Sequence, residues 1–245
     1  MATPKLRAVL FDFMGTCLDW HTGALSILPS TIPDKERSTL ALEWRQTYFD
    51  INTARLAANL PVQDIDITLA DALRKTLDEQ FPQYKPAFQH NDAVERCVQQ
   101  WHSMPAWPDV APAISALKDE GYEIFVFANG TTRLQLHLCK SSGLRFDMLF
   151  SSQLLGSLKP GREAYERVLE LTGLRAEECV QVAAHIEDLR GAKKVGMKTV
   201  YIERWTDDVR VDKRCVKASG EVDVWLDGGM GGLVEAVKSL DTDVV

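Results

Sequence analysis

Short apolar segments alternate with helix-like segments over most of the chain, and this alternation is the strongest constraint on its fold. The first apolar segment, Ala8–Phe11, ends in Asp12 and is followed by Gly15 and Thr16. A later segment, Glu123–Ala128, is apolar enough to be buried on both faces, as parallel strands usually are. Such alternation implies an α/β fold of the Rossmann-like kind, with a parallel sheet, right-handed crossovers and helices on both faces. A carboxylate directly after the first strand then lies where these sheets bind ligands.

The later elements follow from the same two periodicities. Further strands are expected at residues 148–152, 179–184, 198–202 and 222–226, and helices at 109–120, 131–142, 162–171, 188–195 and 233–240. Gly121, Gly143 and Gly173 each end a helical run. The stretch Arg204–Ser219 is the longest without a regular pattern, and we expect a surface loop there.

The segment between Trp20 and Met104 has a different character from the rest of the chain. Apolar residues recur there at roughly helical spacing, as at Trp44 and Tyr48, and β-branched runs are absent. We therefore expect a core domain made of residues 1–19 and 105–245, interrupted by a helical cap domain of residues 20–104.

Composition excludes several classes of protein. The 245 residues carry a net charge of −7, which disfavours nucleic acid as a partner. No apolar stretch approaches the length of a membrane span, and the N-terminal residues do not resemble a signal peptide. The five cysteines are scattered without a Cys-x-x-Cys pair, which is typical of reduced thiols. We expect a cytoplasmic protein that binds neither nucleic acid nor membrane.

Four short motifs occur in a fixed order. Asp12 ends the first strand, Asn129 follows Ala128, Lys159 precedes Pro160, and the run Ala183-Ala184-His185-Ile186-Glu187-Asp188 comes last. This ordered set resembles the motifs of the haloacid dehalogenase superfamily, and within it the L-2-haloacid dehalogenase branch. The resemblance covers nearly the whole chain. It implies a hydrolase whose nucleophile is Asp12; taken alone, Asp12 is also an acid that could cap a turn.

Two acids of the phosphatase branch are missing. Phosphatases of the superfamily carry a second Asp two residues after the nucleophile, where this chain has Met14, and a Gly-Asp pair where it has Ala183-Ala184. The first acid protonates a leaving oxygen, a step that halide does not need. The second is a Mg²⁺ ligand, and hard cations require several oxygen ligands. We therefore expect no metal and no organic cofactor.

The resemblance implies further catalytic roles. Thr16 would position the Asp12 carboxylate, Lys159 would keep that carboxylate ionised, and Asp188 would pair with Lys159 and help activate water. Asp188 is also a candidate N-cap of the helix that follows. The family usually has Asn where this chain has His185, and His185 is either the base that activates water or a structural residue.

Substrate-binding residues are expected in the cap as well as in the core. Trp44-Arg45-Gln46 resembles the cap segment of the dehalogenases, and the guanidinium of Arg45 suits a carboxylate or halide. Asn129 would bind the same anions, and Met14 would line the pocket. Trp44 would form a wall of the pocket or pack in the core. Tyr165 aligns with an active-site tyrosine of the family or is a helix residue packed on the sheet.

The expected reaction is hydrolytic dehalogenation. Asp12 would displace halide from a small (S)-2-haloalkanoate, and hydrolysis of the aspartyl ester would give the (R)-2-hydroxy acid. The alternatives are a relative recruited to another ester or lactone, a phosphatase, and a binding protein without turnover. The substitutions Ala128 and His185 favour the recruited relative. The resemblance also raises the expectation of a homodimer, for which the sequence identifies no interface.

Overall fold

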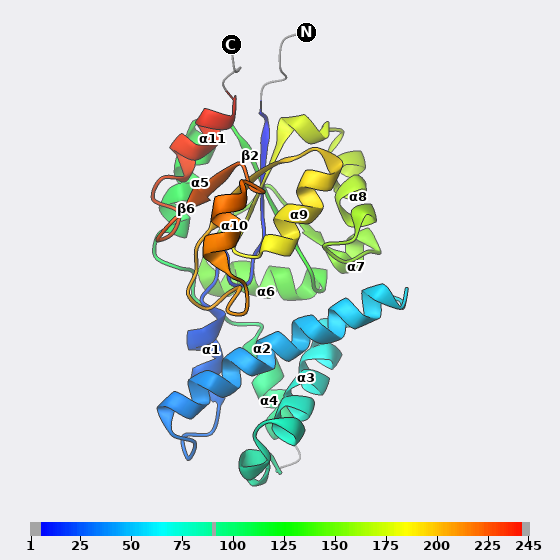
Figure 1. Cartoon of the computed structure of the whole chain (residues 1–245), viewed down its shortest axis with the longest axis vertical. Coiled ribbons are helices and arrows are strands. Elements are labelled where there is room, and N and C mark those ends of the chain that lie inside the picture. The colour runs from blue at the N-terminus through cyan, green and yellow to red at the C-terminus, as the bar shows by residue number, and fades with distance from the viewer. Residues whose placement is uncertain (1–5, 90–91, 242–245) are drawn as a thin grey trace.

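The computed structural model describes residues 6–89 and 92–241, and it confirms the α/β fold with an inserted helical region. A six-stranded parallel sheet has the order β3-β2-β1-β4-β5-β6. Figure 1 shows this sheet with helices on both sides and the inserted helices gathered at one end. The strands are β1 (Ala8–Phe11), β2 (Glu123–Ala128), β3 (Met148–Ser151), β4 (Cys179–Ala183), β5 (Lys198–Ile202) and β6 (Val224–Leu226).

Both faces of the sheet are covered because its strands are apolar on both sides. Val9 and Phe11 of β1 belong to one buried cluster, and Ala8 and Leu10 to another. The helices that follow the cap are α5 (Val110–Asp119), α6 (Thr132–Ser142), α7 (Ser152–Leu155), α8 (Arg162–Thr172), α9 (Ile186–Val195), α10 (Lys213–Ser219) and α11 (Leu233–Asp241), with a 3₁₀ turn η2 at Ala176–Glu178. Helices α5 and α11 contribute to the first cluster, and α8 and α9 to the second.

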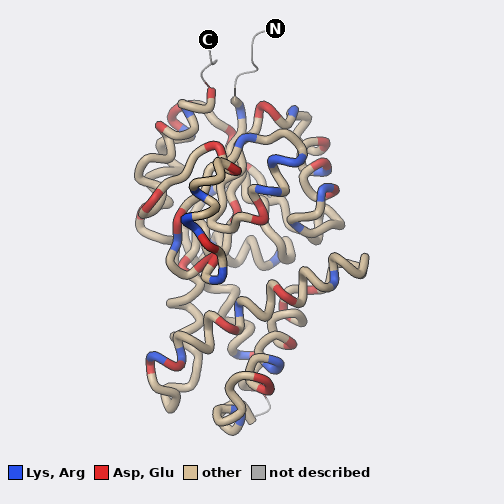
Figure 2. The backbone as a smooth tube through the Cα atoms, in the orientation of Figure 1, with Lys and Arg blue, Asp and Glu red and all other residues tan. Residues whose placement is uncertain are grey.

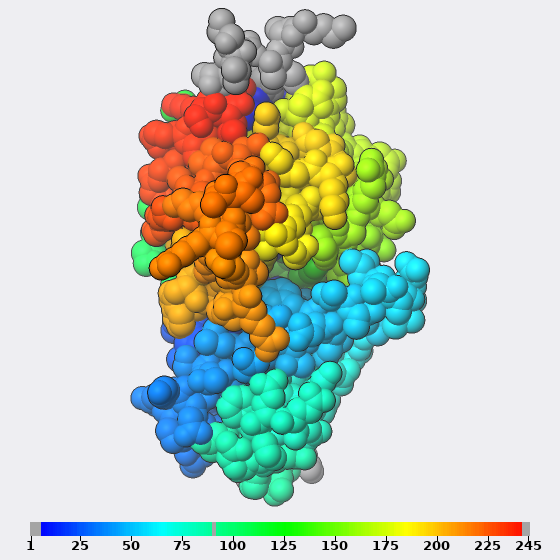
Figure 3. All heavy atoms as spheres, in the orientation of Figure 1, coloured from blue at the N-terminus to red at the C-terminus, as the bar shows by residue number. Residues whose placement is uncertain are grey.

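The inserted region is helical, as its periodicity predicts. It contains α1 (Trp20–Ile27), α2 (Asp34–Ala57), α3 (Ile65–Glu79), η1 (Pro82–Phe88) and α4 (Ala93–Gln100). Trp101 packs between Trp20, at a ring-centroid distance of 5.6 Å, and Trp44, at 5.2 Å. Figure 3 shows α2 lying directly against the core. None of the helices in the described part of the chain is both long and apolar enough to cross a membrane.

The prediction of a surface loop over Arg204–Ser219 is wrong. Its second half forms α10, and in its first half Arg204, Thr206 and Asp207 are buried. Polar side chains are buried there because they bond to other segments rather than to water. Helix α9 begins at Ile186 with His185 as its N-cap, so the prediction that Asp188 caps this helix is also wrong.

The packing of α8 on α9 generates a prediction about Gly191. A Cβ atom on Gly191 would lie 2.5 Å from the hydroxyl oxygen of Tyr165, whose ring is fully buried and whose hydroxyl donates to the carbonyl of Asp188. We predict that Gly191→Ala lowers the free energy of unfolding by about 1–3 kcal/mol through overpacking, although alanine favours helix.

Urea denaturation measures this loss, and Gly231→Ala is the matched control because a Cβ there meets no atom within 4 Å. Equal stabilities of the two variants would show that Tyr165 moves to accommodate the new Cβ atom without any loss in the free energy of unfolding.

Candidate active site

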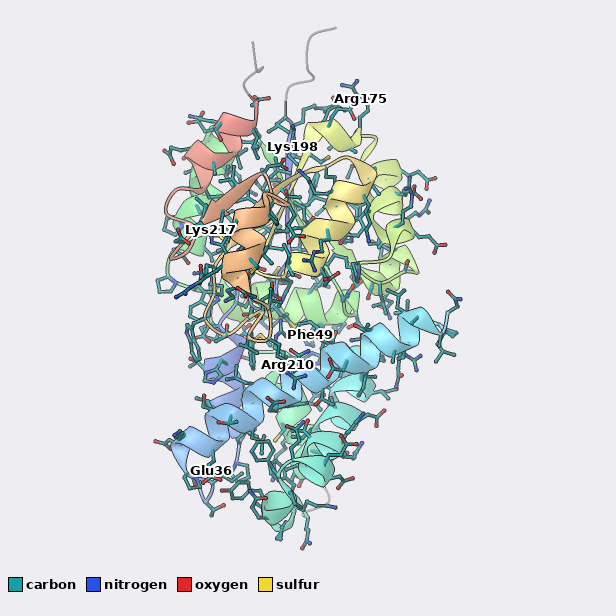
Figure 4. All side chains as sticks on the ribbon, in the orientation of Figure 1. Glu36, Phe49, Arg175, Lys198, Arg210 and Lys217 are labelled. Atoms are coloured by element: carbon teal, nitrogen blue, oxygen red, sulfur yellow. The ribbon has the colours of Figure 1, made fainter. Side chains whose placement is uncertain are left out.

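The candidate active site lies at the carboxyl edge of the sheet, where α2 covers it. Asp12 follows β1, Asn129 follows β2 and His185 follows β4. Parallel strands end at the same edge, which is why residues so far apart in sequence converge here. Arg45 reaches this edge from α2. Figure 4 labels Phe49 of the same helix in the region between α2 and the core.

Asp12, Lys159 and Asp188 form a buried ion cluster. The Nζ atom of Lys159 donates to Oδ1 of Asp12 at 2.9 Å and also to Oδ2 of Asp188. Thr16 donates its hydroxyl to the other oxygen of Asp12 at 2.7 Å and accepts the backbone N–H of Ala184. The structure therefore brings Thr16, Lys159 and Asp188 together around Asp12, as sequence reasoning grouped them.

The charges in this cluster set its protonation. Burial disfavours an ionised Asp12, but the positive charges of Lys159 and His185 outweigh burial and lower the pKa of Asp12. Burial, with the charge of Asp12 added, raises the pKa of Asp188 in spite of Lys159. Burial disfavours the ammonium of Lys159, yet the two carboxylates raise its pKa. Asp12 is thus the more acidic of the two carboxylates, and Asp188 is the one that accepts a proton more readily.

Asn129 supports the lysine as well as lining the pocket. Its side-chain nitrogen donates to the carbonyl of Lys159 at 2.9 Å, and its side-chain oxygen accepts the backbone N–H of Lys159 at 2.8 Å. This two-way bond fixes the segment that carries Lys159 relative to the end of β2.

The side chain of Arg45 is buried among aromatic rings and points from α2 toward the core domain. Its guanidinium carbon lies 4.9 Å from the ring centre of Trp20, 4.8 Å from that of Phe49 and 5.6 Å from that of Trp101. Its Nη2 donates to the carbonyl of Met14 at 2.7 Å. Its Nη1 is buried without a hydrogen-bond partner, which leaves a donor free for an anion.

His185 sits among carboxylates. Its Nε2 lies 3.3 Å from Oδ1 of Asp207 and 3.8 Å from Oδ2 of Asp12, and its Nδ1 lies 3.7 Å from Oδ1 of Asp208. Burial favours the neutral ring, but these carboxylates outweigh burial and the opposing charge of Arg45 and raise the pKa of His185 to about 9. His185 is therefore an imidazolium at neutral pH and not a free base.

A pocket of about 320 Å³ opens over these groups. Its core side includes Asp12, Met14, Asn129, Lys159, Pro160, His185, Asp188 and Val211. Its cap side follows α2 from Arg45 through Phe49 to Leu56. The eleven steps from Arg45 to Leu56, at about 1.5 Å each, correspond to a length of about 16 Å. Figure 3 shows the segment around Arg210, in orange, reaching down to α2, and Arg210 there pairs with Glu43 and Asp50.

Three predicted site residues lie behind the pocket wall. Trp44 is fully buried and donates its ring N–H to the carbonyl of Leu69, so it packs in the cap and does not line the pocket. Tyr165 packs against Phe127 at 5.0 Å, and its hydroxyl bonds to the backbone of Asp188. Thr16 contacts Asp12 but is itself fully buried.

The other described histidines lie outside the pocket. His21 bonds to Ser38, and His102 bonds to Asp66 and His137. His90 lies outside the described residues.

Sequence reasoning missed Asp207 and Asp208. Both follow β5 after a short connection, and both contact His185. The signal that identified Asp12, an acid after a buried strand, is present here too, but five residues separate Asp208 from the end of the strand.

The donor set does not resemble a metal site. Within residues 6–89 and 92–241, no group of three or more His, Cys, Asp or Glu side chains is arranged to hold a metal ion. The cations Lys159, Arg45 and His185 lie among the carboxylates of the site.

Comparison with known proteins decides the family. The model of the haloacid dehalogenase-like hydrolases matches residues 6–196. The chain belongs to this family of hydrolases. Within the family it falls in the L-2-haloacid dehalogenase branch, as the ordered motifs predict.

Individual relatives agree with this placement. An (S)-2-haloacid dehalogenase from Burkholderia cepacia is 28% identical, with 82% of this chain and 84% of the relative covered. The crystal structure of the defluorinating L-2-haloacid dehalogenase Rha0230 is 31% identical, covers 81% of this chain and 82% of its own, and has a TM-score of 0.72. The crystal structure of the L-2-haloacid dehalogenase PA0810 is 26% identical in sequence, and the match covers 96% of this chain and 99% of PA0810 with a TM-score of 0.75.

Some relatives are phosphatases, over a smaller share of the chain. An enolase-phosphatase from Pseudomonas syringae is 31% identical, but over only 40% of this chain and 44% of its own.

The raised pKa of His185 predicts how stability depends on pH. The pKa of His185 is about 9 in the folded chain and about 6.5 when unfolded. The stabilisation from its protonated form is therefore complete below about pH 6.5 and is lost as pH rises through 9. We predict that His185→Gln costs more stability at pH 6 than at pH 9.5, by up to about 3 kcal/mol.

Urea unfolding of both proteins at the two pH values measures this difference, and the comparison cancels the titration of all other groups. A cost that is the same at both pH values would mean that His185 is neutral throughout.

Proposed function

We propose that this hydrolase is a metal-independent 2-haloacid dehalogenase that uses Asp12 as a covalent nucleophile. The observation that carries the proposal is the state of Asp12: it is ionised beside Lys159, at the floor of a pocket, with Met14 where a phosphatase has its acid. A carboxylate held in place and shielded from water is an effective nucleophile toward carbon. Halide leaves without a proton, so this reaction does not need an acid at position 14.

The first step displaces halide. An oxygen of Asp12 forms a bond to C2 of an (S)-2-haloalkanoate from the side opposite the halogen, and the C2–halogen electron pair leaves with the halide. Arg45, through its unpartnered Nη1, and His185, as an imidazolium, supply positive charge for the substrate carboxylate and the departing halide. Asn129 also lines the pocket.

The second step hydrolyses the aspartyl ester. Water attacks the carboxyl carbon of Asp12, and the bond from this carbon to the oxygen carried by the substrate breaks. The released (R)-2-hydroxy acid keeps an oxygen of Asp12, and the water oxygen replaces it. Lys159 and His185 are both protonated at neutral pH, and Asp188 has the raised pKa of a carboxylate base. Asp188 is therefore the group that takes one proton from the attacking water and passes it to the oxygen that leaves with the substrate. The second proton of that water goes to solvent as Asp12 returns to its ionised form.

Halide release from the two enantiomers of 2-chloropropionate, with EDTA present, tests the proposal. We expect release from the (S) form only, and a loss of at least about 10³-fold in Asp12→Asn because the covalent route is closed. Asp147→Asn is the matched control, since Asp147 caps the opposite edge of the sheet through the N–H of Ile124.

A single turnover in H₂¹⁸O identifies the intermediate. The proposal requires ¹⁸O in the Asp12 carboxylate and unlabelled hydroxy acid as product. Label in the product, or phosphate release that needs Mg²⁺, would replace the proposal with direct hydrolysis or with a phosphatase.

The length of the pocket favours substrates larger than chloropropionate. Its volume is about 320 Å³, and a cavity of roughly 150 Å³ already holds benzene, which has as many heavy atoms as 2-chloropropionate. We predict that 2-chlorohexanoate has a kcat/KM within about tenfold of that for 2-chloropropionate.

The variant Leu56→Trp, at the far end of the α2 wall, should reduce kcat/KM for 2-chlorohexanoate by about tenfold more than for 2-chloropropionate. Leu60→Trp is the control because Leu60 is exposed beyond the end of α2. An equal loss for both substrates would show that the substituent does not extend along α2.

A further inference from the structure

Asp207 is the most deeply buried carboxylate near the site, although it does not line the pocket. Its side chain is fully inaccessible, and it lies in the segment between β5 and α10. Figure 2 shows acidic and basic residues close together along this segment, below α10. An isolated carboxylate is costly to bury, so its partners must compensate for the lost water.

Four donors surround this carboxylate. Oδ1 lies 3.3 Å from Nε of Arg45 and 3.3 Å from Nε2 of His185. Oδ2 accepts the ring N–H of Trp20 at 3.3 Å and the hydroxyl of Thr206 at 2.6 Å. An ionised carboxylate has about four acceptor sites, and these donors fill them. They come from the cap and from two loops of the core, so Asp207 joins three separate segments.

Arg45 and His185 lie close together on one side of Asp207. Nη2 of Arg45 is 3.2 Å from Nε2 of His185. Two cations at this distance repel each other, and the carboxylate of Asp207 beside both offsets this repulsion. Acceptors outnumber donors around both nitrogens of His185. The groups that face it are Asp12, the carbonyl of Met14, Arg45, Asp207 and Asp208, with Asp188 further along its own helix.

We propose that Asp207 is a positioning residue that holds Arg45 and His185 side by side as two cations facing the anionic substrate. It acts through these two side chains, because it does not itself reach the pocket. The kinetic role rests on the proposed function, whereas the charge state of His185 is independent of any substrate.

The position of these two cations matters for the electrostatics of the site. Asp12 and Asp188 share the single cation Lys159, which leaves no surplus of positive charge on that side. A haloacid brings another negative charge and releases a halide. Arg45 and His185 supply two positive charges on the side of the site away from Lys159. Asp207 contacts both of them from outside the pocket and holds them in place.

Gly15 makes room for this arrangement. A Cβ atom on Gly15 would overlap the carboxylate of Asp207, and the φ angle of Gly15 is +94°. The turn that carries the nucleophile and the segment after β5 are therefore matched to each other.

The first test is Asp207→Asn, which keeps the shape and removes the charge. We expect the pKa of His185, followed by NMR of ¹⁵N-labelled histidine rings, to fall by one to three pH units. His185→Gln assigns the signal. Asp109→Asn is the matched control, since it breaks a comparable ion pair, with Arg204, that does not face His185. An unchanged titration of His185 in Asp207→Asn would overturn the proposal.

The kinetic readout separates positioning from a general loss of structure. In Asp207→Asn, kcat/KM for (S)-2-chloropropionate should be within about tenfold of wild type at pH 6, where at least about half of His185 is still protonated. At pH 8.5 the loss should be larger, by about 3-fold if the pKa of His185 falls by one unit and by about 200-fold if it falls by three. A loss that is equal at both pH values would show a merely structural role. No turnover by the wild type would remove the proposed function and leave the NMR test standing.

If Asp207→Asn is too unstable for NMR or kinetics, a double-mutant cycle measures the coupling of Asp207 to His185 through stability. Replacing His185 by Asn as well removes one charge of each sign, so Asp207→Asn should destabilise the His185→Asn protein less than it destabilises the wild type. In addition, the wild-type His185 must titrate above pH 8. Equal costs in the two backgrounds, or a wild-type titration near pH 6.5, would overturn the proposal.

Discussion

The buried ammonium of Lys159 is the interaction on which the site depends. It contacts Asp12, at the end of β1, and Asp188, in the first turn of α9. Two carboxylates this deeply buried could not both ionise without it. Removing one partner of such a cluster typically costs about 3–5 kcal/mol, because a buried charge is left unpaired. The Asn129 bonds that fix the lysine segment are thus part of the same electrostatic arrangement.

A second set of charges balances the first from the opposite side. Asp207 and Asp208 follow β5, Arg45 descends from α2, and His185 lies between them. The helical insert therefore contributes a charged side chain as well as a cover. The rings of Trp20, Phe49 and Trp101 hold the guanidinium of Arg45 while leaving Nη1 unpaired. A cap that excludes water strengthens every charge interaction beneath it.

His185 shows how tertiary contacts change the meaning of a residue. From sequence it was a candidate base, because histidine usually titrates near neutral pH. Three carboxylates from two segments keep it protonated, which suits it to receive an anion and not to take a proton. Trp44 is a similar case: the sequence left a pocket wall and core packing open for it, and the structure packs it in the cap, where its ring N–H bonds to the carbonyl of Leu69.

The sequence alone determined the parallel α/β fold and the helical insert, and its resemblance to the ordered motifs of the family predicted that Asp12, Asn129, Lys159, His185 and Asp188 meet. Apolar periodicity identifies strands, and parallel strands all end at one edge. Tertiary structure alone decided that Arg204–Ser219 returns to the site with two acids, and that Arg45 stacks among three rings. An irregular segment has no apolar periodicity from which its path through the fold could be predicted. Its path depends on which buried polar groups it can satisfy, and those groups come from distant parts of the chain.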